Sequence, residues 1–245
     1  ENVTEKNGGA IYNNGSGWFI FITLDSNLSS PAGVGGAVYN LGSLVVKNSI
    51  FSFNTSYNES MLDYGGGVFN DHIITLQNVT FSHNSADWGG GLFNQGDQAY
   101  LYSVTFTENT NAIHNTSPLW IKNSIVANSS PGVNCSGFPD ITSLEYNLDS
   151  GDTCNFDVDE HIDIENTDPM LGELADNQGP TLTHALLAGS PAIDHGDPSD
   201  CPSTDQRGFF RPADGDGNGT RLCDIGAYEH LAPLLSLIYL PILGK

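Results

Sequence analysis

The residues whose types and spacing are best suited to chemistry lie in one glycine-rich run that follows Ala213. Oxygen-bearing side chains occupy its first, third, fifth and seventh positions, and Gly219 occupies the sixth. Loops that bend around a hard cation such as Ca²⁺ use this pattern. The twelfth position, normally a glutamate, is Ile225, and the nearest acids are Asp224 and Glu229. The run therefore predicts either a plain Asp/Gly/Asn turn or a structural Ca²⁺ site formed by Asp214, Asp216, Asn218, Thr220 and Asp224.

Residues suited to catalysis are sparse. A polysaccharide lyase needs a base and cations that hold an acidic sugar, yet before Arg207 the chain has three lysines and no arginine. A glycosidase needs two carboxylates about 5–9 Å apart across a groove. Acids at corners of the chain can supply such a pair beside Trp88, a platform for a sugar ring: Asp63, Asp71, Asp87 and Asp97. Because no acidic pair recurs at matching positions, we predict a non-catalytic protein. The alternative is a carbohydrate-active protein that binds or cleaves a polysaccharide.

These side chains must be positioned by the repeat array that we expect over residues 1–130. GGGVFN at 65–70 with VTFSHN at 79–84 returns as GGGLFN at 89–94 with VTFTEN at 104–109. A unit of about 25 residues that recurs in the same internal order indicates a solenoid. Its apolar pieces are short and rich in Val, Ile, Phe and Thr, which is typical of strands. The sequence predicts an all-β parallel β-helix, because a β-sandwich has no reason to repeat one phrase.

In a parallel β-helix, each residue stacks on its counterpart in the next coil, about 4.8 Å away. We expect one interior apolar column at Phe51, Phe81, Phe106 and Ile125. We expect a second column at Val38, Val68, Leu92 and Ile113. Recurring asparagines are expected to form ladders in which each side-chain amide bonds to the next. The two series are Asn13, Asn40, Asn70, Asn94 and Asn115, and Asn54, Asn84, Asn109 and Asn128.

The four cysteines form two local pairs and lack the CxxC spacing of many zinc sites. We therefore expect the two disulfides of an exported protein, Cys135–Cys154 and Cys201–Cys223. Each closes a loop of about 20 residues and stabilises the fold by about 3 kcal/mol through the unfolded state. Both lie where the repeat signal fades, which is where covalent links are most useful.

Residues 131–230 have a different texture, with Pro and Gly at close intervals in 168–197. GPTLTHALLAGSPAIDHGD (179–197), TDQRGFFRP (204–212) and CDIGAYE (223–229) closely resemble the choice-of-anchor Q domain, which is found at the end of β-helical surface proteins. The GGA/FxxN phrases more loosely resemble the repeats of polymorphic outer-membrane proteins, which are adhesin-like right-handed β-helices. Together the resemblances imply an exported, surface-associated, right-handed parallel β-helix. We expect residues 131–230 to be an irregular continuation of this β-helix, in which 168–197 forms short strands and turns wrapped on the stack. Neither family implies a fixed chemistry.

The charge of the chain limits its partners. The net charge is −22, with nine of the 29 acids in residues 1–130 and the other twenty after them. So acidic a protein is a poor partner for nucleic acid, because it has little with which to neutralise phosphates. The chain starts inside what looks like a broken repeat, without an initiator methionine. We therefore expect a trimmed product that is extracellular or on the cell surface.

The last segment, residues 231–245, is an apolar tail that two prolines interrupt and that is too short to span a membrane. The ends of a β-helix carry unpaired backbone groups. The tail is therefore expected either to contact the next copy, giving a head-to-tail homo-oligomer, to pack on its own chain, or to act as an attachment signal. A surface glycan is the other candidate partner. Self-association is assigned to Leu234, Leu235, Leu237, Ile238, Tyr239, Leu240 and Ile242.

Overall fold

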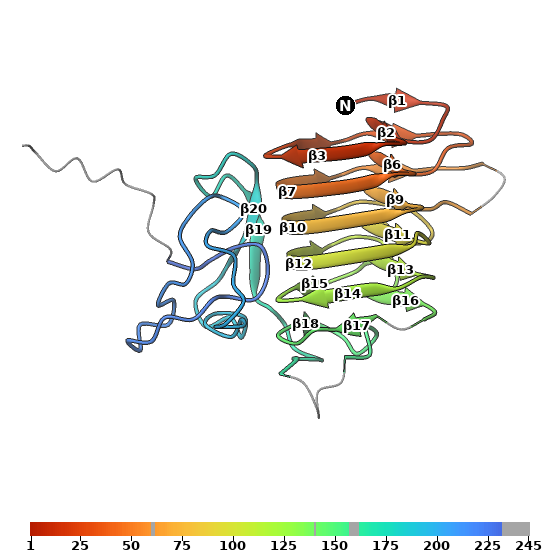
Figure 1. Cartoon of the computed structure of the whole chain (residues 1–245). Coiled ribbons are helices and arrows are strands. Elements are labelled where there is room, and N and C mark those ends of the chain that lie inside the picture. The colour runs from red at the N-terminus through yellow and green to blue at the C-terminus, as the bar shows by residue number, and fades with distance from the viewer. Residues whose placement is uncertain (60–61, 140, 157–161, 232–245) are drawn as a thin grey trace, which may run out of the picture.

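The computed structural model describes residues 1–59, 62–139, 141–156 and 162–231. This part of the chain contains strands and no α-helix. Nearly all of the strands pair in parallel and wind into successive coils, stacked from the N-terminus downward in Figure 1. The prediction of an all-β parallel β-helix is confirmed.

Three parallel sheets form the walls of the stack. The first has the strand order β16-β13-β11-β9-β6-β2, with the bounds, from β2 to β16, Ile11–Asn13, Val38–Asn40, Val68–Asn70, Leu92–Asn94, Ile113–Asn115 and Cys135–Gly137. The largest has the order β17-β14-β12-β10-β7-β3, with the bounds, from β3 to β17, Ser16–Ile20, Ser43–Ser52, Ile73–Ser82, Gln98–Thr107, Leu119–Lys122 and Thr142–Ser143. Three short strands belong to the same sheet: β4 (Thr23–Asp25), β15 (Ile125–Ala127) and β18 (Leu148–Asp149). The third sheet consists of β1 (Val3–Thr4), β5 (Leu28–Ser29) and β8 (Thr55–Ser56).

The interior of the stack is built from columns of like residues. Phe81 of β10 is in register with Phe51 of β7 and Phe106 of β12. Its ring lies 4.6 Å from that of Phe51 and 4.5 Å from that of Phe106, with the planes nearly parallel. All three rings are fully buried. Val38, Val68, Leu92 and Ile113 form the second column in the predicted register.

Each long strand turns a corner at one residue, and that residue switches which side chains face the interior. In β10, Ile74 and Leu76 point inward, whereas after the corner Val79 and Phe81 do so. The corner residue Asn78 has a φ of 53°, a left-handed conformation that asparagine tolerates better than most residues. The residues that follow the corner on the outside are therefore Thr80 and its counterparts in neighbouring coils.

This corner overturns two of the predicted assignments. Asn123 is the corner residue of its coil, with a φ of 52°, so Val126 and not Ile125 lies in register with Phe106. Ile125 is in register with Thr105 and packs in a separate apolar cluster outside the stack. The same one-residue shift removes Asn128 from its ladder, where its backbone N–H instead donates to Ser150 Oγ.

Asparagines, all of them buried except the half-buried Asn13, form the two ladders along the stack. In one, successive Nδ2–Oδ1 bonds of 2.6, 2.7, 2.8 and 2.8 Å join Asn13, Asn40, Asn70, Asn94 and Asn115. In the other, bonds of 2.8, 2.9 and 2.9 Å join Asn27, Asn54, Asn84 and Asn109. Asn27 is thus a member that the sequence reading missed. Each ladder supplies buried backbone groups at a turn with partners that a sheet cannot provide there.

The paired glycines allow two turns of adjacent coils to touch. Gly65 has a φ of 64°, which glycine adopts without strain. A β-carbon on the next residue, Gly66, would lie 2.5 Å from the carbonyl oxygens of Gly90 and Ser85. Any side chain at Gly66 would therefore separate the coils, which explains why the GG pair recurs.

The region after residue 130 has two parts. β16, β17 and β18, followed by the parallel bridge between Leu148 and Ile164, extend the coil. Residues from β19 (Leu171–Ala175) onward instead leave the coil and lie beside the stack, where β19 and β20 (Thr183–Leu186) form an antiparallel pair running along its axis (Figure 1). We call residues 169–231 the side cover. The coil thus continues to the bridge at Ile164, whereas the side cover is not a further turn of it.

One disulfide, Cys135–Cys154, lies in the extended coil, and the other, Cys201–Cys223, lies in the side cover. Both pairings are those expected from the sequence. The tail residues assigned to self-association lie outside the described residues.

Candidate functional site

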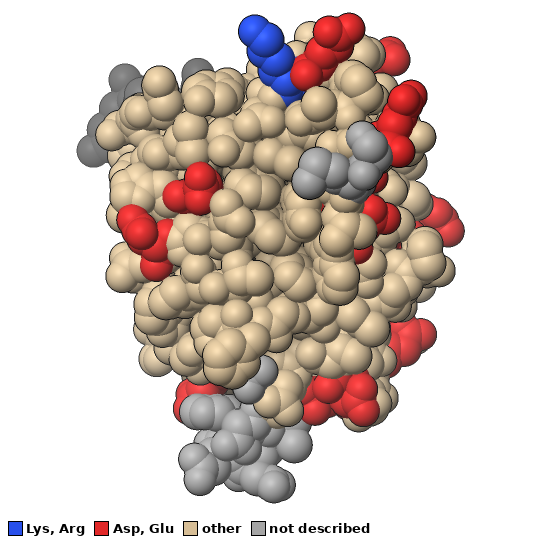
Figure 2. Space-filling model, turned by 90° about the vertical axis from the view of Figure 1, so that its right-hand side faces the viewer, with Lys and Arg blue, Asp and Glu red and all other residues tan. Residues whose placement is uncertain are grey.

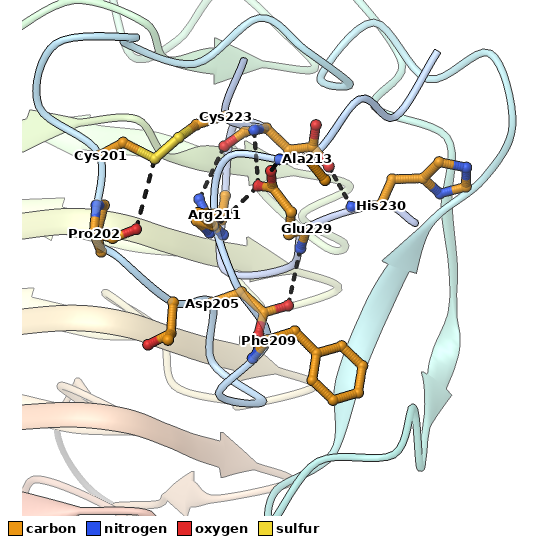
Figure 3. A network of polar contacts seen from close by, with 12 residues as sticks. Cys201, Pro202, Asp205, Phe209, Arg211, Ala213, Cys223, Glu229 and His230 are labelled. Atoms are coloured by element: carbon orange, nitrogen blue, oxygen red, sulfur yellow. Dashed lines mark hydrogen bonds and ion pairs between the residues drawn. A yellow bond between two sulfur atoms is a disulfide. The ribbon is translucent and has the colours of Figure 1, made fainter. Parts of the chain in front are cut away.

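The side cover is held together by a buried network of charged groups (Figure 3). Asp205 is fully buried, and its carboxylate accepts hydrogen bonds from the backbone N–H groups of Arg207, Phe209 and Glu229 at 2.9–3.1 Å. The Arg207 side chain adds a hydrogen bond from Nε at 2.8 Å and an ion pair at 2.7 Å. One carboxylate therefore joins two segments of the backbone, residues 205–209 and the segment that contains Glu229.

A second ion pair lies beside it. Arg211 Nε is 3.4 Å from Glu229 Oε2, and both side chains are completely buried. The guanidinium also donates to the carbonyl oxygens of Asp224 at 3.1 Å and Gly226 at 2.7 Å. Burial raises the pKa of Glu229 to about 7, and the charge of Arg211 opposes that rise. The residues of 204–212 and 223–229 thus hold one another in place.

The network docks on the outward positions that follow the strand corners. Thr80 Oγ1 donates to Gln206 Oε1 at 2.7 Å, and Thr105 Oγ1 accepts from the N–H of Ala227 at 3.0 Å. Asn123 Oδ1 accepts from the N–H of Asp197 at 2.8 Å. Ile125, displaced from the interior, packs here against apolar residues of the cover. The side cover therefore packs on residues that lie at the strand corners or just after them: Thr80, Thr105, Asn123 and Ile125.

Three acids of the side cover converge at its surface. Asp194, Asp214 and Asp216 each bring a carboxylate oxygen into a group whose members lie within 4.8 Å of one another. Asp194 is buried, Asp214 is half-buried and Asp216 is exposed. Asp194 Oδ2 accepts the backbone N–H of Asp216 at 2.8 Å, which holds the glycine-rich loop against it.

Other residues predicted for a cation site take different roles. Asn218 donates from its backbone and its side chain to the carboxylate of Asp216, and its Oδ1 accepts the N–H of Thr220 at 2.7 Å. Asp224 lies behind the loop, where its carboxylate accepts N–H groups of Asp194 and His230. The structure therefore places Asp194, which the sequence reading missed, where Asp224 was expected. No local spacing signals Asp194, because it lies 20 residues before the loop.

A groove of about 400 Å³ runs along the outer face of the largest sheet, beside the side cover. Lys47, Gln77, Tyr102 and Lys122, which are in register on successive strands, line it together with Asp200 of the cover. Lys122 pairs with Asp197 at 2.8 Å and with Asp200 at 3.2 Å. Thr75, which also lines the groove, is in register with Tyr100, whose ring stacks on that of Trp120 with centroids 5.0 Å apart. Half-buried aromatic rings next to polar groups are the usual means of holding a sugar.

The acids proposed for glycoside cleavage lie elsewhere. The backbone N–H of Asp63 donates to Asp87 Oδ2 at 3.2 Å, so these two acids are neighbours. Burial, and then the charge of Asp87, raises the pKa of Asp63 to about 6. Trp88 packs its ring 4.6 Å from that of His114. Asp71 and Asp97 are held by Gln95 and His72, respectively.

The repeat family described as the Chlamydia polymorphic membrane protein (Chlamydia_PMP) repeat matches residues 78–95. This segment runs from the corner at Asn78 through Phe81 and the glycines at 89–91 to Gln95, which directly follows β11. Among curated proteins and solved structures, none matches this chain. Within the described residues, no helix is long and apolar enough to cross a membrane. The repeat and the parallel coil together fit a surface-exposed β-helix protein.

Proposed function

We propose that this chain is a non-catalytic structural or adhesive component of a cell surface, exported and assembled head to tail. One observation carries the proposal: the recurring asparagines of the repeats and the charged residues of 204–212 and 223–229 form hydrogen bonds and ion pairs that hold the fold together. Both asparagine ladders are buried except for the half-buried Asn13, and Asp205, Arg211 and Glu229 lie in the interior of the side cover. Such residues stabilise a scaffold and are not available to a substrate.

The matched repeat supports a place on the cell surface. Its relatives, by name, are membrane proteins of Chlamydia, and a long rigid coil is suited to presenting a surface away from a cell. Figure 2 shows a broad face of the molecule on which charged groups are few and acids gather toward the edges. A face with so little positive charge supports binding to glycan or protein rather than to nucleic acid.

The choice-of-anchor Q resemblance supports the same reading. The residues that carry it, in 179–197, 204–212 and 223–229, build the side cover and seal one wall of the stack. Because the side cover occupies this wall, we place the contact between copies at the ends of the described coil. In the described residues, β2 and β3 pair on one side only, with β6 and β7, and unpaired strand edges are templates for strand addition.

We expect the full chain to form head-to-tail polymers and a chain that lacks residues 231–245 to remain monomeric. The tail is the apolar segment that would pair with the open coil of the next copy. Light scattering coupled to size exclusion, with electron microscopy of the same fractions, measures both states. Polymers that persist without residues 231–245 would contradict a role of the tail in self-association. A monomeric full chain would contradict head-to-tail assembly itself.

A matched pair of substitutions tests the other end. Ile11 lies at the end of the interior column that Val38 continues, whereas its neighbour Tyr12 points outward and is 54% exposed. Ile11→Glu places a charge in the proposed contact and is expected to stop polymerisation. Tyr12→Glu adds the same charge to the same strand and is expected to leave polymers intact.

The groove supports a second candidate function, recognition of a polysaccharide. Lys47, Gln77 and Tyr102 form an in-register row along it, and the stacked rings of Tyr100 and Trp120 lie on the same sheet, in register with the lining residue Thr75. On a glycan array, Trp120→Ala is expected to lower binding of any recognised glycan by up to about tenfold, since a ring contact contributes about 0.5–1.5 kcal/mol. Trp88→Ala, at the Asp63–Asp87 corner, is expected to have no effect. Loss of binding with Trp88→Ala alone, or release of sugar that Asp87→Asn abolishes, would move the site to that corner.

A further inference from the structure

We infer that Asp194, Asp214 and Asp216 bind a hard divalent cation, with Ca²⁺ as the best fit. Their carboxylate oxygens lie within 4.8 Å of one another. They come from two segments, the turn at Asp194 and a loop closed by the antiparallel bridge between Ala213 and Leu222. Three negative charges this close repel one another. A cation among them turns that repulsion into attraction.

A separate observation points to a ligand at this place. Asp194 is 6% exposed, and its Oδ1 has no hydrogen-bond partner. Its other oxygen accepts the N–H of Asp216, so the carboxylate faces the loop. Asp214 Oδ1 is also buried and has no partner. Buried carboxylate oxygens are normally satisfied, and these two are satisfied if they bind a cation.

The donors select the kind of cation. All three are carboxylates, and oxygen donors without thiolate or imidazole favour Ca²⁺ or Mg²⁺ over Zn²⁺. Ca²⁺ accepts six to eight oxygens in irregular geometry and tolerates water among them. Asp216 and Asn218 are exposed, so water can reach the open side of the group. Mg²⁺ demands a near-octahedral set and dehydrates reluctantly, which this two-segment arrangement suits less well.

The cation would act as a link within the side cover. The backbone N–H of Asp194 donates to Asp224 Oδ1 at 2.8 Å, and the neighbouring Ile193 packs in the apolar cluster that contains Ile125. A β-carbon on Gly215 would meet Ile193 Cγ2 at 2.7 Å, so glycine is required for the loop to lie this close. Ca²⁺ at this point would therefore tie the loop to the segment that docks on the stack.

The test is calorimetric titration of the chelator-stripped full chain with Ca²⁺ alone and with Mg²⁺ alone, together with the melting temperature in each ion. Ca²⁺ is expected to bind in a one-to-one ratio and to raise the melting temperature by several degrees, because a ligand that binds only the folded state stabilises it. Asp194→Asn is expected to weaken Ca²⁺ binding by about tenfold or more, since ligand charge sets the affinity of such sites. Its fold is retained because the amide oxygen can still accept the N–H of Asp216.

Asp176→Asn is the matched control. Asp176 is exposed, and its Oδ1 accepts the N–H of Gln178 at 2.9 Å, just as Asp216 Oδ1 accepts the N–H of Asn218 at 2.9 Å. Asp176→Asn is expected to bind Ca²⁺ like the unmodified chain, and Asp216→Asn is expected to bind it weakly. No heat and no melting shift with either ion would overturn the site. Equal Ca²⁺ binding by Asp194→Asn and the unmodified chain would overturn the assignment of Asp194.

Discussion

Replacing Arg211 with methionine is expected to destabilise the protein by about 3–5 kcal/mol, because it leaves a buried carboxylate without its cation. Glu229 would keep the N–H donors of Ala213 and Asp224 but lose the guanidinium 3.4 Å away. The carbonyl oxygens of Asp224 and Gly226 would lose their donors as well. Thermal unfolding measures the loss of stability. Limited proteolysis is expected to cut first within the side cover.

The pH dependence follows from the same pair. The pKa of Glu229 is raised from its ordinary value of 4.5 to about 7 in the folded state, with burial as the main cause and Asp224 as the neighbouring acid. The stability that protonated Glu229 contributes is fully present below pH 4.5 and is lost as the pH rises through 7. The ion pair with Arg211 contributes most to the free energy of unfolding when Glu229 is charged. The cost of Arg211→Met is therefore expected to be larger at pH 8 than at pH 5.

The double variant Arg211→Met/Glu229→Gln is the control for this prediction. It removes both charges at similar side-chain volumes, so it is expected to recover the part of the loss that comes from the unpaired carboxylate. The amide nitrogen of glutamine cannot accept the second of the two N–H groups that Glu229 holds, so the recovery is expected to be partial. No recovery, together with a cost that does not change with pH, would mean that Arg211 acts through packing and its carbonyl contacts rather than through the ion pair.

Phe81→Ala is expected to cost about 3–5 kcal/mol, the range for a buried phenylalanine whose neighbours cannot close the space. Phe81 is fully buried between the rings of Phe51 and Phe106. The backbone hydrogen bonds on both sides keep the coils at a fixed separation, so the gap cannot collapse. A chain of this size should melt about 10 °C lower, which calorimetry measures directly.

Phe53→Ala is the matched control on an adjacent coil. Phe53 is 49% exposed and stacks on the half-exposed His83 at 4.7 Å. Its removal opens no cavity and is expected to cost less than about 1 kcal/mol. If the two alanine variants melted at the same temperature, the aromatic column would not be the main support of the stack.

Part of the candidate site could be predicted from the sequence. The alternating acids from Asp214 onward predict a loop suited to a cation, and the spacing of the cysteines predicts both disulfides that the structure contains. The sequence reading then supplied Asp224 as a ligand because it is close along the chain. In the structure, Asp224 faces the backbone of Asp194 and His230, and Asp194 itself faces the loop. Proximity along the chain does not show which way a carboxylate points.

The sequence alone determined the coil, its register over the central repeats and most of the two asparagine ladders. These depend on contacts between residues about 20–30 positions apart that recur in each turn, so the repeat itself reports them. The repeat does not show that the corner residue switches which side chains face the interior. The predicted positions of Ile125 and Asn128 are therefore wrong by one residue.

Only the tertiary structure decided where the side cover lies and which acids meet. Thr80 contacts Gln206 across 126 residues, and Ser82 contacts His184 across 102. Each of these long-range contacts occurs only once, so no periodic pattern in the sequence predicts it. It forms because Thr80 and Ser82 point outward after a corner, where the stack has polar groups to satisfy. The coil can be predicted from the sequence because its contacts repeat. The docking of a non-repeating segment cannot, because it depends on surfaces that exist only once the coil has formed.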